Sequence, residues 1–209
     1  MVYEIVYFDH YGRVDLVKLI AEVANIPYKF VGIEDKDWKD FQPTTRYGLL
    51  PFVKVNDKWT LYQSIAISRF FAQEGEGNLY PTDRVEATIT EEYVAALEDA
   101  YNQFVYATFL APEDRKEEET KRLTEGVLKN VFKVLNAELE KNGGYLLPGD
   151  RLTWADLYFA EFASNLEYYT KIKPVDFAPQ IPKLRENVLK HPRAKAYLES
   201  ERNLRKIVF

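Results

Sequence analysis

Cysteine is absent from this 209-residue sequence, and its only two histidines are His10 and His191. The missing cysteines exclude a disulfide framework, Cys-ligated zinc, iron–sulfur clusters and a cysteine nucleophile. Because so few histidines are available, we also predict that the protein holds no metal. A chain without cysteine fits a reducing compartment, so a cytoplasmic location is the expectation.

Long apolar runs and an excess of basic charge are missing as well. No stretch reaches the roughly 18 apolar residues of a transmembrane helix, which predicts no membrane insertion. Lys and Arg number 28 against 33 Asp and Glu, a formal net charge of −5. A nucleic-acid-binding face is normally basic, so nucleic acid is not an expected partner. The composition that remains, 46% apolar and 29% charged, is that of an ordinary globular protein.

The spacing of apolar residues predicts a small α/β domain over residues 1–76. Residues 2–8 are rich in Val, Ile, Tyr and Phe, as a buried strand is. From Val14 the apolar residues recur at helical spacing, and Pro27 ends that segment. The predicted order is a strand over residues 2–8, a helix over 14–24 and a strand over 28–33. After an irregular connector follow strands over 50–55 and 59–62 and a helix over 65–73. The opening β-α-β unit should have parallel strands with a right-handed crossover.

A linker over residues 77–83 and an all-helical domain over residues 84–209 are predicted to follow. Amphipathic runs separated by prolines predict helices over residues 85–110, 117–141, 154–171, 181–191 and 193–200. Thr153 and Asp156 have the spacing of a capping box, which should start a buried helix of this domain. The predicted fold class is therefore an α/β domain followed by an all-α domain.

Three features of the first domain could carry chemistry. Tyr7 ends the first strand, where open α/β sheets usually bind ligands, so its hydroxyl could donate to an anion. The residues alone favour the alternative of a core tyrosine with a backbone partner. Pro51 stands at the start of a strand, where its missing N–H could leave the strand edge open to another extended chain. The alternative is that Pro51 only marks the start of the strand. Gln63-Ser64 precedes a helix, where Ser caps the N-terminus or its N–H groups attract a carboxylate.

Taken together, these motifs resemble a glutathione transferase along the whole chain. Val6-Tyr7-Phe8 followed by Gly12-Arg13 is similar to the start of the sigma class, whose tyrosine is catalytic. The most specific match, to the glutathione-binding signature, is Leu61-Tyr62-Gln63-Ser64-Ile65-Ala66-Ile67-Ser68-Arg69. The other matching segments are Asp37-Trp38, Tyr47-Gly48-Leu49-Leu50-Pro51, Leu97-Glu98-Asp99 and Leu152-Thr153-Trp154-Ala155-Asp156. The resemblance implies a thioredoxin-like first domain.

The resemblance also implies site residues, with glutathione as co-substrate and no other cofactor. Tyr7 would hydrogen-bond the glutathione sulfur, and Arg13 would add positive field there. The remaining glutathione contacts would come from Trp38, Leu50, Pro51, Gln63 and Ser64, and from Asp99 of the partner subunit in a homodimer. A hydrophobic electrophile would lie over Phe8, Tyr106, Tyr158, Phe162 and Phe209.

Two positions depart from the family pattern. Gln42 and Leu49 stand where the family often has Lys, and Gln or Lys, which weakens the clamp on the glycyl carboxylate. Each missing charge-assisted bond is worth ~1.5–3 kcal/mol if nothing replaces it. Arg46 could compensate, depending on where its side chain points.

The expected function is conjugation of glutathione, activated as thiolate by Tyr7, to hydrophobic electrophiles. A prostaglandin-type isomerase and a hydroperoxide peroxidase would use the same thiolate. A non-catalytic ligand-binding or structural protein on this fold is the third alternative. The identity of the second substrate and the physiological role, whether detoxification, lipid-mediator synthesis or ligand carriage, stay open at this stage.

Overall fold

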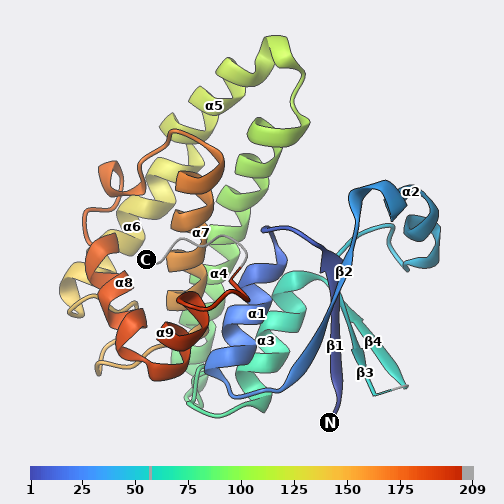
Figure 1. Cartoon of the computed structure of the whole chain (residues 1–209). Helices are drawn as coiled ribbons and strands as arrows, with labels where there is room; N and C mark the ends of the chain where they lie inside the picture. The colour runs from blue at the N-terminus through green and yellow to red at the C-terminus, as the bar shows by residue number, and fades with distance from the viewer. Residues whose placement is uncertain (57, 204–209) are drawn as a thin grey trace. The chain divides into compact units, whose positions relative to one another are not determined.

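The computed structural model describes residues 1–56 and 58–203 (Figure 1). Within them the chain divides into two compact units. The first comprises residues 1–79 together with residues 192–203, and the second comprises residues 80–191. None of the described helices is both long enough and apolar enough to cross a membrane.

A four-stranded mixed sheet forms the first unit. The strands are β1 (Tyr3–Phe8), β2 (Tyr28–Ile33), β3 (Phe52–Val55) and β4 (Trp59–Tyr62), in the spatial order β2-β1-β3-β4. β1 runs parallel to β2 and antiparallel to β3, and β4 pairs antiparallel with β3. The parallel pair and the hairpin follow the predicted strand order.

Two helices of the first unit pack side by side on this sheet, α1 (Val14–Val23) and α3 (Ser64–Glu74) (Figure 1). Every residue of α1 except Glu22 is buried, which is why its sequence is almost continuously apolar. Short turns of helix connect the strands and helices on the way to β3: Asp35–Asp37, α2 (Trp38–Phe41) and Gln42–Thr44.

Helices are the only regular secondary structure among the described residues of the second unit. Its helices are α4 (Arg84–Val105), α5 (Lys116–Glu125), α6 (Val127–Lys141), α7 (Trp154–Tyr169) and α8 (Ile181–Lys190), with a π-helical turn at Tyr106–Leu110 and 3-10 turns at Glu113–Arg115 and Pro174–Asp176. α7 is the centre of the unit, because all its residues from Trp154 to Leu166 are buried. Aromatic rings fill the surrounding core, with centroids 4.9 Å apart for Phe132 and Phe159.

The predicted fold class, a thioredoxin-like α/β domain followed by helices, is confirmed. One predicted helix differs: residues 117–141 form two helices, α5 and α6, which meet at Gly126. The Gly126 backbone has φ −106° and ψ −114°, outside the helical region, and a Cβ there would lie 2.5 Å from the Arg122 carbonyl oxygen. Only glycine fits this bend without a shift of its neighbours.

The C-terminal stretch also differs from the predicted domain assignment. The sequence predicts one helical domain over residues 84–209, whereas residues 192–203 group with the first unit. The reason is packing of α9 (Pro192–Leu198) on α1, continued by a hydrogen bond of 3.0 Å from the Lys18 Nζ to the Arg202 carbonyl oxygen. These partners are 184 residues apart in sequence.

Candidate functional site

Residues predicted to bind glutathione converge at one end of the sheet. The strand register aligns Val6 with Phe52 and Phe52 with Tyr62. Residues that come just after Val6 and Tyr62, or just before Phe52, therefore lie at the same edge. Those residues are Tyr7, Leu50, Pro51, Gln63 and Ser64.

The Tyr7 hydroxyl is held at this edge by the turn that follows β1. Its oxygen accepts a hydrogen bond from the Arg13 backbone N–H at 3.2 Å. Burial raises the pKa of Tyr7 to about 12, although the Arg13 N–H opposes that rise by favouring the ionised phenol. The hydroxyl is protonated at neutral pH, and the bond from Arg13 uses only a lone pair of its oxygen, so its proton can be donated to another group.

Gly12 leaves the space that this hydroxyl occupies. A Cβ at Gly12 would lie 2.5 Å from the Tyr7 Oη, closer than real Cβ atoms approach another atom. No larger residue fits between the turn and the hydroxyl unless one of them moves.

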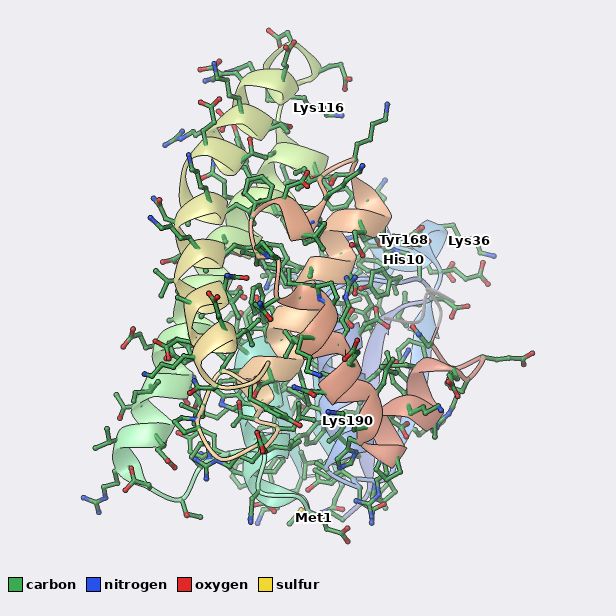
Figure 2. The ribbon with its side chains drawn as sticks, turned by 90° about the vertical axis from the view of Figure 1, so that its left-hand side faces the viewer. Met1, His10, Lys36, Lys116, Tyr168 and Lys190 are labelled. Carbon is green, nitrogen blue, oxygen red and sulfur yellow. The ribbon has the colours of Figure 1, made fainter. Side chains whose placement is uncertain are left out.

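Aromatic rings line the neighbouring loops. The Phe8 ring lies 5.1 Å from that of Trp38 at an angle of 70°, and stacks on that of His10 at 5.3 Å. Figure 2 labels His10 and Lys36, which come from the loops after β1 and β2. A hollow of about 470 Å³ lies between these loops and is lined by Asp9, His10, Ile33, Glu34, Asp35 and Lys36.

The backbone has unusual conformations just before β3 and just before α3. The Leu50–Pro51 peptide bond is cis. Gln63 has φ +69° and ψ 113°, and its carbonyl oxygen accepts a hydrogen bond from the Ile67 N–H at 3.0 Å. Ser64, the first residue of α3, is buried, and it follows Gln63 directly at the end of the helix where unpaired N–H groups attract anions.

In the loop between residues 42 and 48, the Arg46 side chain points toward Tyr62. The Gln42 amide donates to the Gly48 carbonyl oxygen at 3.1 Å, which closes this loop on itself. The Arg46 guanidinium lies over the Tyr62 ring, 4.8 Å from its centroid, and the Arg46 N–H donates to the Tyr62 hydroxyl at 3.3 Å. Arg46 therefore belongs to the same sheet edge as Gln63.

Comparison with known proteins decides the family. A 28 kDa class-mu glutathione S-transferase isozyme of Schistosoma mansoni is 30% identical over 203 residues, and the alignment covers 94% of each chain. This chain belongs to the glutathione S-transferase family. Residues 98–201 of the transferase match the family signature for the glutathione S-transferase C-terminal domain. Members of this family use glutathione as co-substrate without a separate cofactor.

Two further relatives are similar over nearly the whole transferase. The hematopoietic prostaglandin D synthase of Gallus gallus is 27% identical over 197 residues, covering 94% of this chain and 95% of its own. The crystal structure of a monomeric glutathione S-transferase from the hookworm Necator americanus superposes with a TM-score of 0.80. It is 27% identical, and the match covers 95% of this chain and 97% of that one.

The predicted residues of the helical unit differ in exposure. Asp99 is exposed on α4, and Tyr106 is 38% exposed where the π-helical turn begins. Tyr158 and Phe162 are buried, with 2% and 0% of their surface exposed, and the Tyr158 hydroxyl donates to a Glu98 carboxylate oxygen at 2.5 Å. Neither has surface to offer a ligand in this structure, so the expectation that these two rings contact the electrophile is not met, and both are core residues of the helical unit. Phe209 lies outside the described residues.

Two charged residues close to the Tyr7 turn, Asp15 and Lys18, were not predicted from the sequence. Both are buried in α1, and an Asp15 carboxylate oxygen accepts the Gly12 N–H at 2.6 Å. The available signal was their position: apart from Glu22, they are the only charged residues in a helix whose other members are apolar. Across residues 1–56 and 58–203, no three Asp, Glu or His side chains gather as a metal site would require.

Replacing Gly12 by Ala is expected to lower the kcat/KM of glutathione conjugation about ten-fold at pH 6.5. The new Cβ would lie only 2.5 Å from the Tyr7 Oη, so the hydroxyl must move away from its position. Initial rates measure the effect. Gly126→Ala is the matched control, since its Cβ meets the Arg122 carbonyl oxygen at the same 2.5 Å, in the helical unit. That variant should melt at a lower temperature and keep its kcat/KM. Equal rates for Gly12→Ala and the wild type would mean that the hydroxyl needs no such space.

Proposed function

We propose that this transferase ionises the thiol of glutathione through the Tyr7 hydroxyl and conjugates the thiolate to hydrophobic electrophiles, as a sigma-like member of the family. The observation that carries the proposal is the position of the Tyr7 hydroxyl: the Arg13 N–H donates to its oxygen at 3.2 Å at the end of β1, and this bond leaves the hydroxyl proton to be donated. Such a hydroxyl is a donor ready for an anion. The proposed location is cytoplasmic.

The energetics of one hydrogen bond suit this role. A thiol with a pKa near 8.5 is only a few per cent ionised at pH 7, and the thiolate is the nucleophile. Lowering that pKa by two units requires ~2.7 kcal/mol. A hydrogen bond to a charged acceptor supplies roughly 1.5–3 kcal/mol, so the Tyr7 donor accounts for most of the activation, with Arg13 adding positive field.

Glutathione is proposed to bind along the sheet edge. Gln63 and Ser64 would hold the γ-glutamyl end at the start of α3, and Leu50 the cysteinyl part through its backbone next to Pro51. Trp38 would contact the glycyl end, where Gln42 and Leu49 lack the positive charge common in the family. Arg46, which lies over the Tyr62 ring, is proposed to supply charge on that side.

In the chemical step, the thiolate attacks an electrophilic carbon held against Phe8. With an aryl halide the carbon–sulfur bond forms, the halide leaves with the carbon–halogen bonding pair, and the thiol proton passes to water. No covalent intermediate with the protein is needed. The aromatic rings of Trp38 and His10, which pack against Phe8, suit a flat apolar substrate.

The proposal is tested by glutathione binding and turnover together. We expect retention on immobilised glutathione, a calorimetric binding signal, and thiol consumption when a model aryl halide is added. A chain that passes through immobilised glutathione and consumes no thiol would be a ligand-binding or structural protein instead.

A glutathione-dependent isomerase is the second candidate, favoured by the likeness to a hematopoietic prostaglandin D synthase. Isomerisation returns the thiol, whereas conjugation consumes it. Incubation with a prostaglandin endoperoxide and glutathione therefore separates the two: product formed at constant thiol indicates the isomerase. Oxidised glutathione formed from an organic hydroperoxide would indicate the peroxidase.

The proposal includes a homodimer, in which Asp99 would pair with the γ-glutamyl ammonium of glutathione bound to the partner. Replacing Asp99 by Asn should then raise the KM for glutathione about ten-fold with little change in kcat, the size of one lost charge-assisted bond. Asp114→Asn, an exposed carboxylate in the 3-10 turn before α5, is the control. Sedimentation of the wild type as a monomer, like the Necator americanus relative, with an unchanged KM in Asp99→Asn would contradict this.

A further inference from the structure

Asp15 and Lys18 form an ion pair that is buried inside the first unit. Their side chains are each 3% exposed, and the Lys18 Nζ lies 3.6 Å from an Asp15 carboxylate oxygen. Burying two charges costs several kcal/mol per ion by general estimates, and an apolar pair of similar volume is often as stable. Stability alone therefore does not explain why two charges lie among the buried residues of α1.

One side of this pair reaches the proposed thiol site through two hydrogen bonds. The other Asp15 carboxylate oxygen accepts the Gly12 N–H at 2.6 Å. The next residue, Arg13, donates its N–H to the Tyr7 hydroxyl at 3.2 Å. The Gly12 and Arg13 N–H groups belong to successive peptide units joined at the Gly12 Cα, so holding the first N–H limits where the second can point.

The other side of the pair is tied to the C-terminal stretch. The Lys18 Nζ donates to the Arg202 carbonyl oxygen at 3.0 Å and lies 4.9 Å from the Phe30 ring centroid and 5.8 Å from that of Tyr197. Lys18 therefore has two roles: its charge balances that of the Asp15 carboxylate, and its hydrogen bond to Arg202 joins α1 to a segment that is distant in sequence.

We propose that Asp15 is a positioning residue for thiol activation: its carboxylate holds the Gly12–Arg13 turn so that the Arg13 N–H reaches the Tyr7 hydroxyl, and Lys18 balances its charge. The inference rests on the proposed function of Tyr7. Without the acceptor at Asp15 the turn relaxes, the Arg13 N–H withdraws from the Tyr7 oxygen, and the hydroxyl proton is no longer directed at the sulfur.

Two double variants of similar volume separate positioning from charge. Asp15→Asn with Lys18→Met removes both charges but keeps an oxygen that can accept the Gly12 N–H. Asp15→Leu with Lys18→Met removes the charges and the acceptor. Neither leaves an uncompensated buried ion, which would unfold the protein for an unrelated reason. Should the Leu variant not fold, Asp15→Ala with Lys18→Met replaces it.

The readouts are urea unfolding, the pH profile of kcat/KM, and amide hydrogen exchange at Gly12 and Arg13 in the protein without glutathione. We expect the Asn variant to stay within about two-fold of the wild type at pH 6.5 and the Leu variant to fall about ten-fold below it, with the profile moved up by about one pH unit. Near pH 9, where free thiol ionises unaided, the two variants should converge. Exchange at Gly12 and Arg13 should be faster in the Leu variant only.

Identical pH profiles and identical exchange in the two variants would overturn the positioning role, whatever their stabilities. Failure of the proposed function looks different: the wild type itself would then conjugate nothing. Even in that case the exchange rates at Gly12 and Arg13 would report whether Asp15 holds the turn.

Discussion

Replacing Tyr7 by Phe should lower the rate of glutathione conjugation at pH 6.5 by roughly 10- to 100-fold, the effect of losing one hydrogen bond to a charged acceptor. The phenyl ring can keep the contacts of the tyrosine ring, whose centroid lies 5.3 Å from that of Phe8, so the fold should survive. The loss should shrink as pH rises toward 9, because the thiol of bound glutathione then ionises without help. Initial rates between pH 6 and 9 measure both the loss and its pH dependence.

Tyr3→Phe is the matched control for this experiment. Tyr3 lies on the same strand, is equally buried, and its hydroxyl donates to the Met1 Sδ at 3.2 Å rather than to anything near the site. Its conjugation rate should equal that of the wild type at every pH. An unchanged rate at pH 6.5 in Tyr7→Phe would show that another group activates the thiol.

The fold class could be predicted from the sequence because apolar residues recur at the spacing typical of a strand or of a helix within each element. The exceptions depend on information that no local period contains. A glycine inside an amphipathic run is compatible with a continuous helix, so only the Gly126 backbone shows the break between α5 and α6. The grouping of residues 192–203 with the first unit depends on packing against α1, which is distant in sequence.

The candidate site divides in the same way. Tyr7, Pro51 and Gln63 could be assigned to one site only through the resemblance of their motifs to the family, and the strand register then brings them to the same end of the sheet. Tyr158 and Phe162 could not be distinguished from core residues, because helical spacing is the same for an aromatic ring facing a ligand and one packed in a core. The contact of Asp15 with Gly12 was equally hidden, since an acidic residue in the first turn of a helix is common on exposed helices.

Asp156 is a buried carboxylate of the helical unit whose hydrogen bonds were partly predicted from the sequence and should contribute strongly to stability. The predicted capping box is confirmed at the start of α7: the Thr153 N–H and hydroxyl donate to one Asp156 carboxylate oxygen at 2.8 and 2.6 Å. The other oxygen accepts the Leu146 N–H at 2.8 Å, which fixes the preceding loop to the helix. Burial raises the pKa of Asp156 to about 6, while these donors lower it by favouring the carboxylate, so the group is ionised at pH 7.

Replacing Asp156 by Ala should therefore lower the free energy of unfolding by about 3–5 kcal/mol, because three buried donors lose their acceptor at ~1–3 kcal/mol each and partly find others. Urea unfolding measures the difference. Asp83→Ala is the control, since Asp83 caps α4 by accepting the Val85 and Glu86 N–H groups at 2.9 and 3.0 Å where water can replace it. That exposed cap should cost only ~1 kcal/mol. Equal losses in the two variants would mean that Asp156 acts as an ordinary helix cap, without the added effect of burial and the Leu146 bond.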